Sequence, residues 1–285
     1  MKALIIGLGW LGLPLASFLK QQNYSVAGTV RSAEKADRMR GLDYQCYPFN
    51  LFEMQTTHIE PSAIKGSKVV INIAPGRKTI DASAYTTGLQ ALIDYLIQHG
   101  AVHIIFVSTT SVFGNQPGRV YESTEPSPLT QSGIAHAQIE SYLLNQHAQY
   151  SSVLRLAGLI GPNIDGSLRH PVFSLIKREK LDAGQQQVNL VHQADVIALI
   201  YAIMQQGKTN EIFHACATEH PSRYDYYTWC AHTLGLDAPK FSAKTTQSNY
   251  SDSKVVDCER SLKVLKHQLL YPSPYDMLAH RSTIY

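Results

Sequence analysis

The sequence has few of the features that mark disulfide-rich, metal-binding or membrane proteins. Its 285 residues include four cysteines, which lie far apart, form no C-x-x-C pair and have no histidine at a metal-ligand spacing. We therefore expect neither a disulfide framework nor a metal site, and reduced thiols are typical of the cytoplasm. No apolar run is long enough to cross a bilayer, so no membrane-spanning segment is expected.

The charge balance gives no sign of nucleic-acid binding. The formal net charge is +3, and the lysines and arginines form no stripe with interleaved aromatic residues. Hydrophobic residues make up 44% of the chain and charged residues 16%, which is typical of a globular protein with a proper core. A chain of this length has room for one large α/β domain, or for a large domain and a small one.

A glycine motif near the N-terminus is the strongest functional signal. Residues 5–12 read Ile-Ile-Gly-Leu-Gly-Trp-Leu-Gly, which places G-x-G-x-x-G between an apolar strand pattern and a helical pattern. Gly7 permits a tight turn, Gly9 leaves room for a pyrophosphate against the backbone, and Gly12 lets the helix pack on the strand. A second strand pattern over 25–30 favours a dinucleotide site over an ordinary glycine-rich turn.

Two groups of residues are expected to contact the phosphates of the dinucleotide. The amides at the start of the helix, those of Trp10 and Leu11 included, would bind the pyrophosphate. The second strand ends in Gly-Thr-Val-Arg-Ser over 28–32, without the acidic residue that usually holds the ribose of NAD. Arg31 could pair with the 2′-phosphate of NADP and Ser32 could hydrogen-bond it, so NADP(H) is favoured over NAD(H). Alternatively, Arg31 is a solvated residue that opens the next helix.

The order of elements predicts a Rossmann-like α/β fold, a doubly wound parallel sheet with a smaller C-terminal substrate lobe. Strand patterns cover 3–6, 25–30, 44–47, 68–75, 103–107 and 152–156, and helix patterns cover 11–20, 33–40, 85–98 and 138–146. Since ligands gather at the carboxyl ends of parallel strands, Ala74, Pro75 and Ser108 are expected beside the glycine loop as cofactor contacts.

The alternation becomes irregular after residue 160. Helix patterns over 172–180, 196–204 and 222–234 surround one strand pattern over 211–215, and one more short helix is expected in the tail. We expect a nucleotide-binding domain over 1–160 and a smaller lobe over 161–285, partly interleaved with it.

Several segments together resemble a known family. Residues 106–114 read FVSTTSVFG, 154–162 read LRLAGLIGP and 189–195 read NLVHQAD. With the glycine loop, they resemble the extended short-chain dehydrogenase/reductase group, the NAD-dependent epimerase/dehydratase family, over nearly the whole chain. The loop differs, since G-x-G-x-x-G replaces the family's usual G-x-x-G-x-x-G.

The resemblance implies a set of catalytic positions, of which only some are retained. Thr109 falls at the family's catalytic Ser/Thr position. The family's Tyr-x-x-x-Lys pair falls on Ser132 and His136, so neither the tyrosine nor the lysine is present. A Ser132–His136 dyad is one reading; a helix cap and a polar helix residue are the other. Tyr121, in the loop over 114–131 that is expected to cross the crevice, could act as a displaced general acid or could only pack.

Three further residues are candidate substrate contacts. Ser111 lies in the same expected crevice as Thr109. Arg155 could hold a phosphate or carboxylate, or could be a hydrogen-bonded arginine that shapes the junction of the lobes. His192 could face the substrate, or could be local structure beside Asp195 as a helix N-cap.

Two hypotheses of different classes follow. In the first, the protein is an NAD(P)-binding epimerase/dehydratase-like oxidoreductase that acts on a small polar substrate, a nucleotide-linked sugar being the one the resemblance implies. In the second, it is a catalytically degenerate sensor of NADP(H) or a scaffold; an atypical reductase that manages without the tyrosine is a third, generic reading. The resemblance also implies a homodimer through the helices over 85–98 and 132–146.

Overall fold

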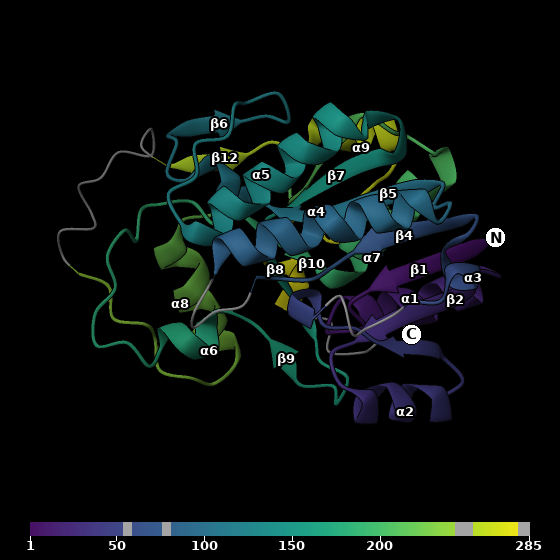
Figure 1. Cartoon of the computed structure of the whole chain (residues 1–285). Helices are drawn as coiled ribbons and strands as arrows, with labels where there is room; N and C mark the ends of the chain where they lie inside the picture. Colours follow the sequence, from purple (N-terminus) through teal and green to yellow (C-terminus); the bar gives the residue numbers. More distant parts are fainter. Residues whose placement is uncertain (54–58, 76–80, 243–252, 279–285) are drawn as a thin grey trace.

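The computed structural model describes residues 1–53, 59–75, 81–242 and 253–278, and its main element is a seven-stranded parallel sheet (Figure 1). The strand order is β11-β7-β5-β4-β1-β2-β3, so the chain starts near the middle of the sheet and winds outward in both directions. This confirms the predicted doubly wound α/β fold. The strands are β1 (Lys2–Ile6), β2 (Ser25–Val30), β3 (Gln45–Pro48), β4 (Ser67–Ile71), β5 (His103–Thr109), β7 (Ser151–Leu156) and β11 (Glu211–Ala215).

Helices cover both faces of this sheet because successive strand residues point to opposite sides. In β1, Ala3 and Ile5 pack with the apolar faces of α1 and α7, whereas Leu4 and Ile6 pack with α4 and α5. Figure 1 shows α4 and α5 side by side in front of the sheet. The helices flanking the sheet are α1 (Gly12–Gln21), α2 (Ala33–Gly41), α3 (Pro61–Ile64), α4 (Ala82–Gln98), α5 (Gln131–Gln146), α7 (Gln193–Gln206) and α9 (Glu259–Leu265).

A second, three-stranded sheet forms the base of the smaller lobe. Its order is β10-β8-β9, with β8 (Gly158–Pro162) parallel to β10 (Leu190–His192) and antiparallel to β9 (Leu168–Arg169). Helices α6 (Val172–Leu175) and α8 (Arg223–Thr233) complete the lobe, at the left of Figure 1. Its apolar core is separate from those of the large sheet.

The chain passes between the two parts more than once. The proposed boundary at residue 160 lies within β8, and β11 comes from beyond it to form one edge of the large sheet. A short parallel pair, β6 (Gly118–Val120) with β12 (Lys254–Val256), joins the loop after β5 to the C-terminal segment. The two domain ranges remain a prediction, and the interleaving is visible in the strand order.

Two sequence predictions need correction. The helix expected over 172–180 ends at Leu175, because residues 177–180 are all charged and exposed and offer no apolar face to the core. Asp195 is not the N-cap of α7. Its buried carboxylate accepts the backbone N–H groups of Leu270 (2.6 Å) and Tyr271 (3.1 Å) instead, and thereby fastens the tail.

No helix in the described part of the chain is both long and apolar enough to cross a membrane.

Candidate functional site

A cavity of about 330 Å³ lies at the carboxyl ends of β1, β2 and β4. Five of the residues predicted to bind the cofactor line it: Gly7, Gly9, Arg31, Ala74 and Pro75. The volume falls in the range of small-molecule sites, about 300–1,000 Å³. The structure therefore brings the glycine loop, the end of the second strand and the turn after the fourth to one place, as the parallel topology requires.

The three glycines differ in what a side chain would meet. A Cβ on Gly7, whose φ is +106°, would lie 2.7 Å from the carbonyl oxygen of Asn72. A Cβ on Gly12 would lie 2.0 Å from the carbonyl oxygen of Gly7, so helix and strand could not pack as they do. At Gly9 no described atom outside the glycine and its two chain neighbours lies within 4 Å of that position. Gly7 and Gly12 are thus required by the fold, whereas the space beside Gly9 suits a ligand pressed against the backbone.

The walls of the cavity carry positive charge. Arg31 and Lys35 both line it, and no carboxylate is among the described lining residues. Ser32, by contrast, is the N-cap of α2, where its hydroxyl accepts the backbone N–H of Lys35 at 3.3 Å. Lys35 was not predicted from the sequence. Its position four residues after Arg31, in the first turn of the predicted helix, would have indicated it.

Other lining residues carried no sequence signal as site residues. The polar ones among them are the hydroxyl of Thr29, the amides of Asn50 and Asn72 and the phenol of Tyr85. Tyr85 is buried, and its hydroxyl donates to the carbonyl of Ile73 at 2.7 Å. These residues become neighbours only through the pairing of strands and the packing of α4.

Trp10, Leu11 and Ser108, which were also predicted to bind the cofactor, are not among the described residues that line this cavity. Leu11 is buried in the core behind the sheet, and the indole of Trp10 donates to the carbonyl of Pro162 at 2.8 Å. Ser108 is also buried, and its hydroxyl donates to the carboxylate of Glu140. Their side chains therefore have structural partners; a contact between a dinucleotide and the backbone of Trp10 or Leu11 stays a prediction.

Thr109 and Ser111 lie together where β5 ends. The Thr109 hydroxyl accepts the backbone N–H of Ser111 and donates to its side-chain oxygen, both at 3.1 Å. Both hydroxyls lie at a carboxyl strand end, where the parallel sheet places ligands.

The geometry of Ser132 and His136 does not show a hydroxyl–imidazole dyad. Nδ1 of His136 lies 2.7 Å from the backbone carbonyl of Ser132, one turn earlier in α5. A carbonyl has no proton to give, so Nδ1 must donate. Burial lowers the pKa of His136, so the neutral ring leaves its lone pair on Nε2. The ring stacks on Phe106 (5.6 Å between centroids) and lies 5.9 Å from the ring of Tyr85, which lines the cavity. His136 is therefore a neutral hydrogen-bond acceptor close to the cavity.

Tyr121 lies in the loop after β6 and is 48% exposed. Its backbone N–H donates to the hydroxyl of Thr124 at 2.8 Å. This exposure does not favour a purely packing role, and its part in proton transfer stays a prediction.

Arg155 makes the hydrogen bonds expected of a structural arginine, and a substrate contact of Arg155 stays a prediction. Its guanidinium is 2% exposed and donates through Nε and Nη2 to the carboxylate of Glu140 (3.0 and 2.7 Å) and through Nη1 to the carbonyl of Glu122 (3.2 Å). The cation also lies 4.8 Å above the ring of Phe113. Arg155 therefore ties β7 to α5 and to the loop at the lobe junction.

His192 likewise has a local structural role. It is the N-cap of α7, and its Nδ1 accepts the backbone N–H of Ala194 at 3.2 Å. The buried ring packs on Tyr271, with centroids 4.1 Å apart. The N-cap function that the sequence suggested for Asp195 thus belongs to His192, and a substrate contact of His192 stays a prediction.

The parallel sheet, the glycine turn and the cavity at the strand ends define a dinucleotide-binding α/β protein of the Rossmann type. The chain belongs to the NAD dependent epimerase/dehydratase family, whose model matches residues 3–216. It is 33% identical to Protein YeeZ of Escherichia coli (strain K12) over 97% of this chain and 98% of that protein.

Solved structures show the same fold at low identity. MoeE5 in complex with UDP-glucose and NAD has a TM-score of 0.77 at 17% identity, over 99% of this chain and 97% of that one. A UDP-glucuronic acid 4-epimerase from Bacillus cereus in complex with NAD has a TM-score of 0.75 at 20% identity, over 98% and 96%.

Proposed function

We propose that the protein is an NADP(H)-dependent oxidoreductase of the epimerase/dehydratase type that acts on a small polar substrate. The observation that carries the cofactor preference is the pair Arg31 and Lys35 on the wall of the glycine-loop cavity. A 2′-phosphate placed there would meet two cations, whereas an NAD-preferring site normally offers a carboxylate to the ribose. Gly9 leaves the space that a pyrophosphate needs, so the residues present fit a dinucleotide.

The reaction would use groups of this chain around the nicotinamide, which supplies a hydride donor or acceptor when bound. Thr109, with Ser111 beside it, would polarise a hydroxyl or carbonyl of the substrate. The Ser132 carbonyl fixes the proton of His136 on Nδ1, so Nε2 would take the proton of a hydroxyl as it is oxidised, and the same carbonyl would favour the charged ring against the cost of burial. Tyr121 is the exposed candidate for the opposite transfer, and the family's tyrosine and lysine are not required in this scheme.

A nucleotide-linked sugar is the substrate class we propose. MoeE5 binds UDP-glucose, and this chain shares its fold over both lobes. A second cavity, of about 560 Å³, lies in the smaller lobe and is lined by Arg169, His170, Phe173 and Lys177 among others. Two cations suit a ligand that carries phosphate groups. The four free, buried cysteines fit a reducing compartment, and we infer a cytoplasmic location.

Calorimetric titration with NADPH, NADP⁺, NADH and NAD⁺ tests the cofactor assignment first. Tight binding of a phosphorylated form supports it and selects the cofactor for a screen of nucleotide sugars by nicotinamide absorbance. Binding of one redox form without turnover of any substrate would favour the sensor hypothesis. If none of the four dinucleotides binds, the enzyme proposal is wrong.

Substitution of Arg31 tests the preference directly. Arg31→Ala should weaken NADPH about tenfold, the value of a hydrogen-bonded charge pair, and leave NADH within about twofold. Arg38→Ala, on the helix that follows Arg31, is the control, since Arg38 pairs with Glu34 and does not line the cavity. Equal losses for NADPH and NADH would contradict the role of Arg31.

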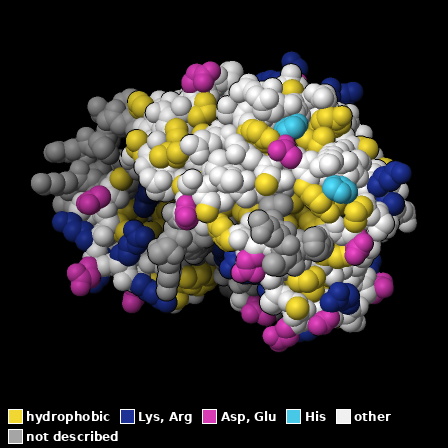
Figure 2. All heavy atoms as spheres, in the orientation of Figure 1, with side chains coloured by type: hydrophobic (Ala, Val, Ile, Leu, Met, Phe, Trp, Pro, Cys, Tyr) yellow, Lys and Arg dark blue, Asp and Glu magenta, His cyan; other side chains and the backbone are white. Residues whose placement is uncertain are grey.

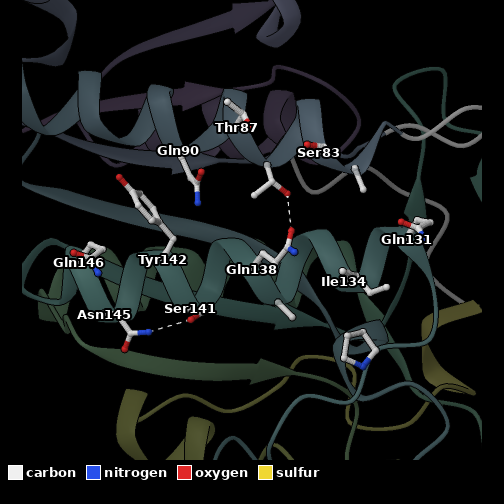
Figure 3. A pocket seen from close by; sticks show the side chains of 14 residues that line it. Ser83, Thr87, Gln90, Gln131, Ile134, Gln138, Ser141, Tyr142, Asn145 and Gln146 are labelled. Atoms are coloured by element: carbon white, nitrogen blue, oxygen red, sulfur yellow. Dashed lines mark hydrogen bonds between the residues drawn. The ribbon is translucent and has the colours of Figure 1, made fainter.

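We also propose that the protein is a homodimer through α4 and α5. A groove of about 940 Å³ runs along these helices, and its described lining residues are all uncharged (Figure 3). Within it, Thr86 donates to Gln138 at 3.1 Å and Asn145 to Ser141 at 3.0 Å. Over α4 and α5, Figure 2 shows mainly uncharged polar and hydrophobic side chains, with most charges nearer the rim. Hydroxyls and amides both donate and accept, so such a face can pair with a second copy of itself.

A further inference from the structure

Trp10 joins the glycine loop to the smaller lobe through three contacts. Its indole Nε1–H donates to the carbonyl of Pro162 at 2.8 Å, and its own carbonyl accepts from Nε2 of Gln193 at 2.8 Å. The guanidinium of Arg169 lies over the indole, 4.2 Å from the ring centroid. Side chain and backbone of one loop residue are therefore both held by the lobe.

Two of the three partners end strands of the second sheet, and the third begins the helix that follows the remaining strand. Pro162 is the last residue of β8, Arg169 is the last residue of β9, and Gln193 directly follows β10. The junction is also tight, because a Cβ on Gly161 would lie 2.8 Å from Cβ of Gln193. A displacement of Trp10 would thus be transmitted to the second sheet through this close packing.

Arg169 stands between Trp10 and the cavity of the lobe. It lines that cavity with His170 and Lys177, and it is not among the described residues that line the dinucleotide cavity. Trp10 therefore has its backbone in the loop that lines one cavity and its ring against a cation that lines the other.

We propose that Trp10 is a positioning residue that couples the two cavities: a dinucleotide bound on the glycine loop fixes the indole, and the indole fixes Arg169 for the substrate. The proposal rests on the proposed function, because it requires that the loop binds a dinucleotide. Coupling between sites is reciprocal. Loss of the Arg169–Trp10 contact should therefore weaken binding of the dinucleotide, although Arg169 lies outside its cavity.

The test is calorimetric titration of the wild type, Arg169→Gln and Lys177→Gln with NADP⁺. Lys177 is the matched control, since it is an exposed cation of the same cavity and is not the cation that lies over Trp10. Arg169→Gln should weaken binding about threefold, the value of an exposed cation–π contact, and Lys177→Gln should leave it unchanged.

Equal losses in both variants would mean that only long-range charge acts, and no loss in either would mean that the cavities are independent. Both results overturn the coupling while the proposed function stands. A wild type that binds no dinucleotide contradicts the proposed function itself, and the coupling with it, so the two failures are distinguishable.

Tryptophan fluorescence gives a second readout. If the contact between Arg169 and Trp10 were merely structural, the change of this fluorescence on binding NADP⁺ would not depend on Arg169. The chain has two tryptophans, so in Trp229→Phe all tryptophan emission comes from Trp10. NADP⁺ should change this emission, and the change should shrink when Arg169→Gln is added. A change of the same size with and without Arg169 would contradict the coupling.

Discussion

At the scale of single residues, substitutions of Gly9 and Gly12 should have opposite effects although both glycines belong to one motif. Gly9→Ala places a methyl group in open space, so the fold should be as stable as the wild type, while NADP⁺ should bind about tenfold more weakly or worse. Gly12→Ala drives a methyl group against the Gly7 carbonyl and should destabilise the protein by about 1–3 kcal/mol or more.

Urea denaturation and calorimetry on the same two variants separate these effects. Each variant serves as the control of the other, because both add one methyl group to the same loop. A Gly12→Ala protein as stable as the wild type would contradict the packing role of Gly12. A Gly9→Ala protein with full affinity would show that no ligand lies against that backbone.

His136 shows what a sequence can and cannot say about a site residue. The sequence alone places His136 where the family has lysine. A neutral imidazole cannot supply the fixed positive charge of a lysine, so a different role for this position could be expected from the sequence. That Nδ1 faces the Ser132 carbonyl and that the ring lies between Phe106 and Tyr85 depend on the side-chain rotamer and on two distant elements. The resulting acceptor on Nε2 could be derived only from the folded chain.

At the scale of elements, α5 is fastened to the sheet by the buried ion pair of Glu140 and Arg155. Both side chains are almost fully buried, at 3% and 2% exposure. Glu140→Ala would leave the guanidinium without its counter-ion and should lower the free energy of unfolding by about 3–5 kcal/mol. Urea denaturation measures this loss. Glu34→Ala is the control, since its pair with Arg38 is exposed and should have little effect.

A second variant shows whether the loss comes from the unpaired charge. Replacing both partners, Glu140→Leu with Arg155→Met, should recover much of the stability, because neither partner then leaves an unpaired charge in the core. If Glu140→Ala costs no more than Glu34→Ala, the pair does not fasten α5.

The elements that the sequence predicted well are those with their own periodic pattern. The predicted strand bounds over 25–30 and 211–215 agree with the structure. Each is a short segment with strand-forming residues that is bounded by turn residues. β8 and β10 were not predicted as strands. They are only five and three residues long, and they become strands by pairing with each other across the intervening lobe. Such non-local pairing leaves no local pattern.

At the scale of the whole molecule, the large sheet and its crevice followed from the alternation of strands and helices, but the junction of the lobes did not. The sequence placed Trp10 in the loop and Arg155 at a strand end. It gave no sign that Trp10 would contact Pro162, Arg169 and Gln193, or that Arg155 would bind Glu140. Side chains that bridge lobes depend on the relative placement of two cores.

The last prediction concerns assembly through the groove of α4 and α5. Ser141 is exposed in this groove, so Ser141→Arg would bury a guanidinium without a partner if two copies met there. Light scattering at micromolar concentration should give the wild type the mass of two chains and Ser141→Arg that of one, 31.7 kDa. Thr233→Arg, at the exposed end of α8, adds the same charge elsewhere and should remain dimeric. A wild type with the mass of one chain contradicts the dimer, and a dimeric Ser141→Arg places the interface on another face. Because the nucleotide cavity lies at the strand ends and not in this groove, the monomeric variant should still bind NADP⁺, which separates assembly from cofactor binding.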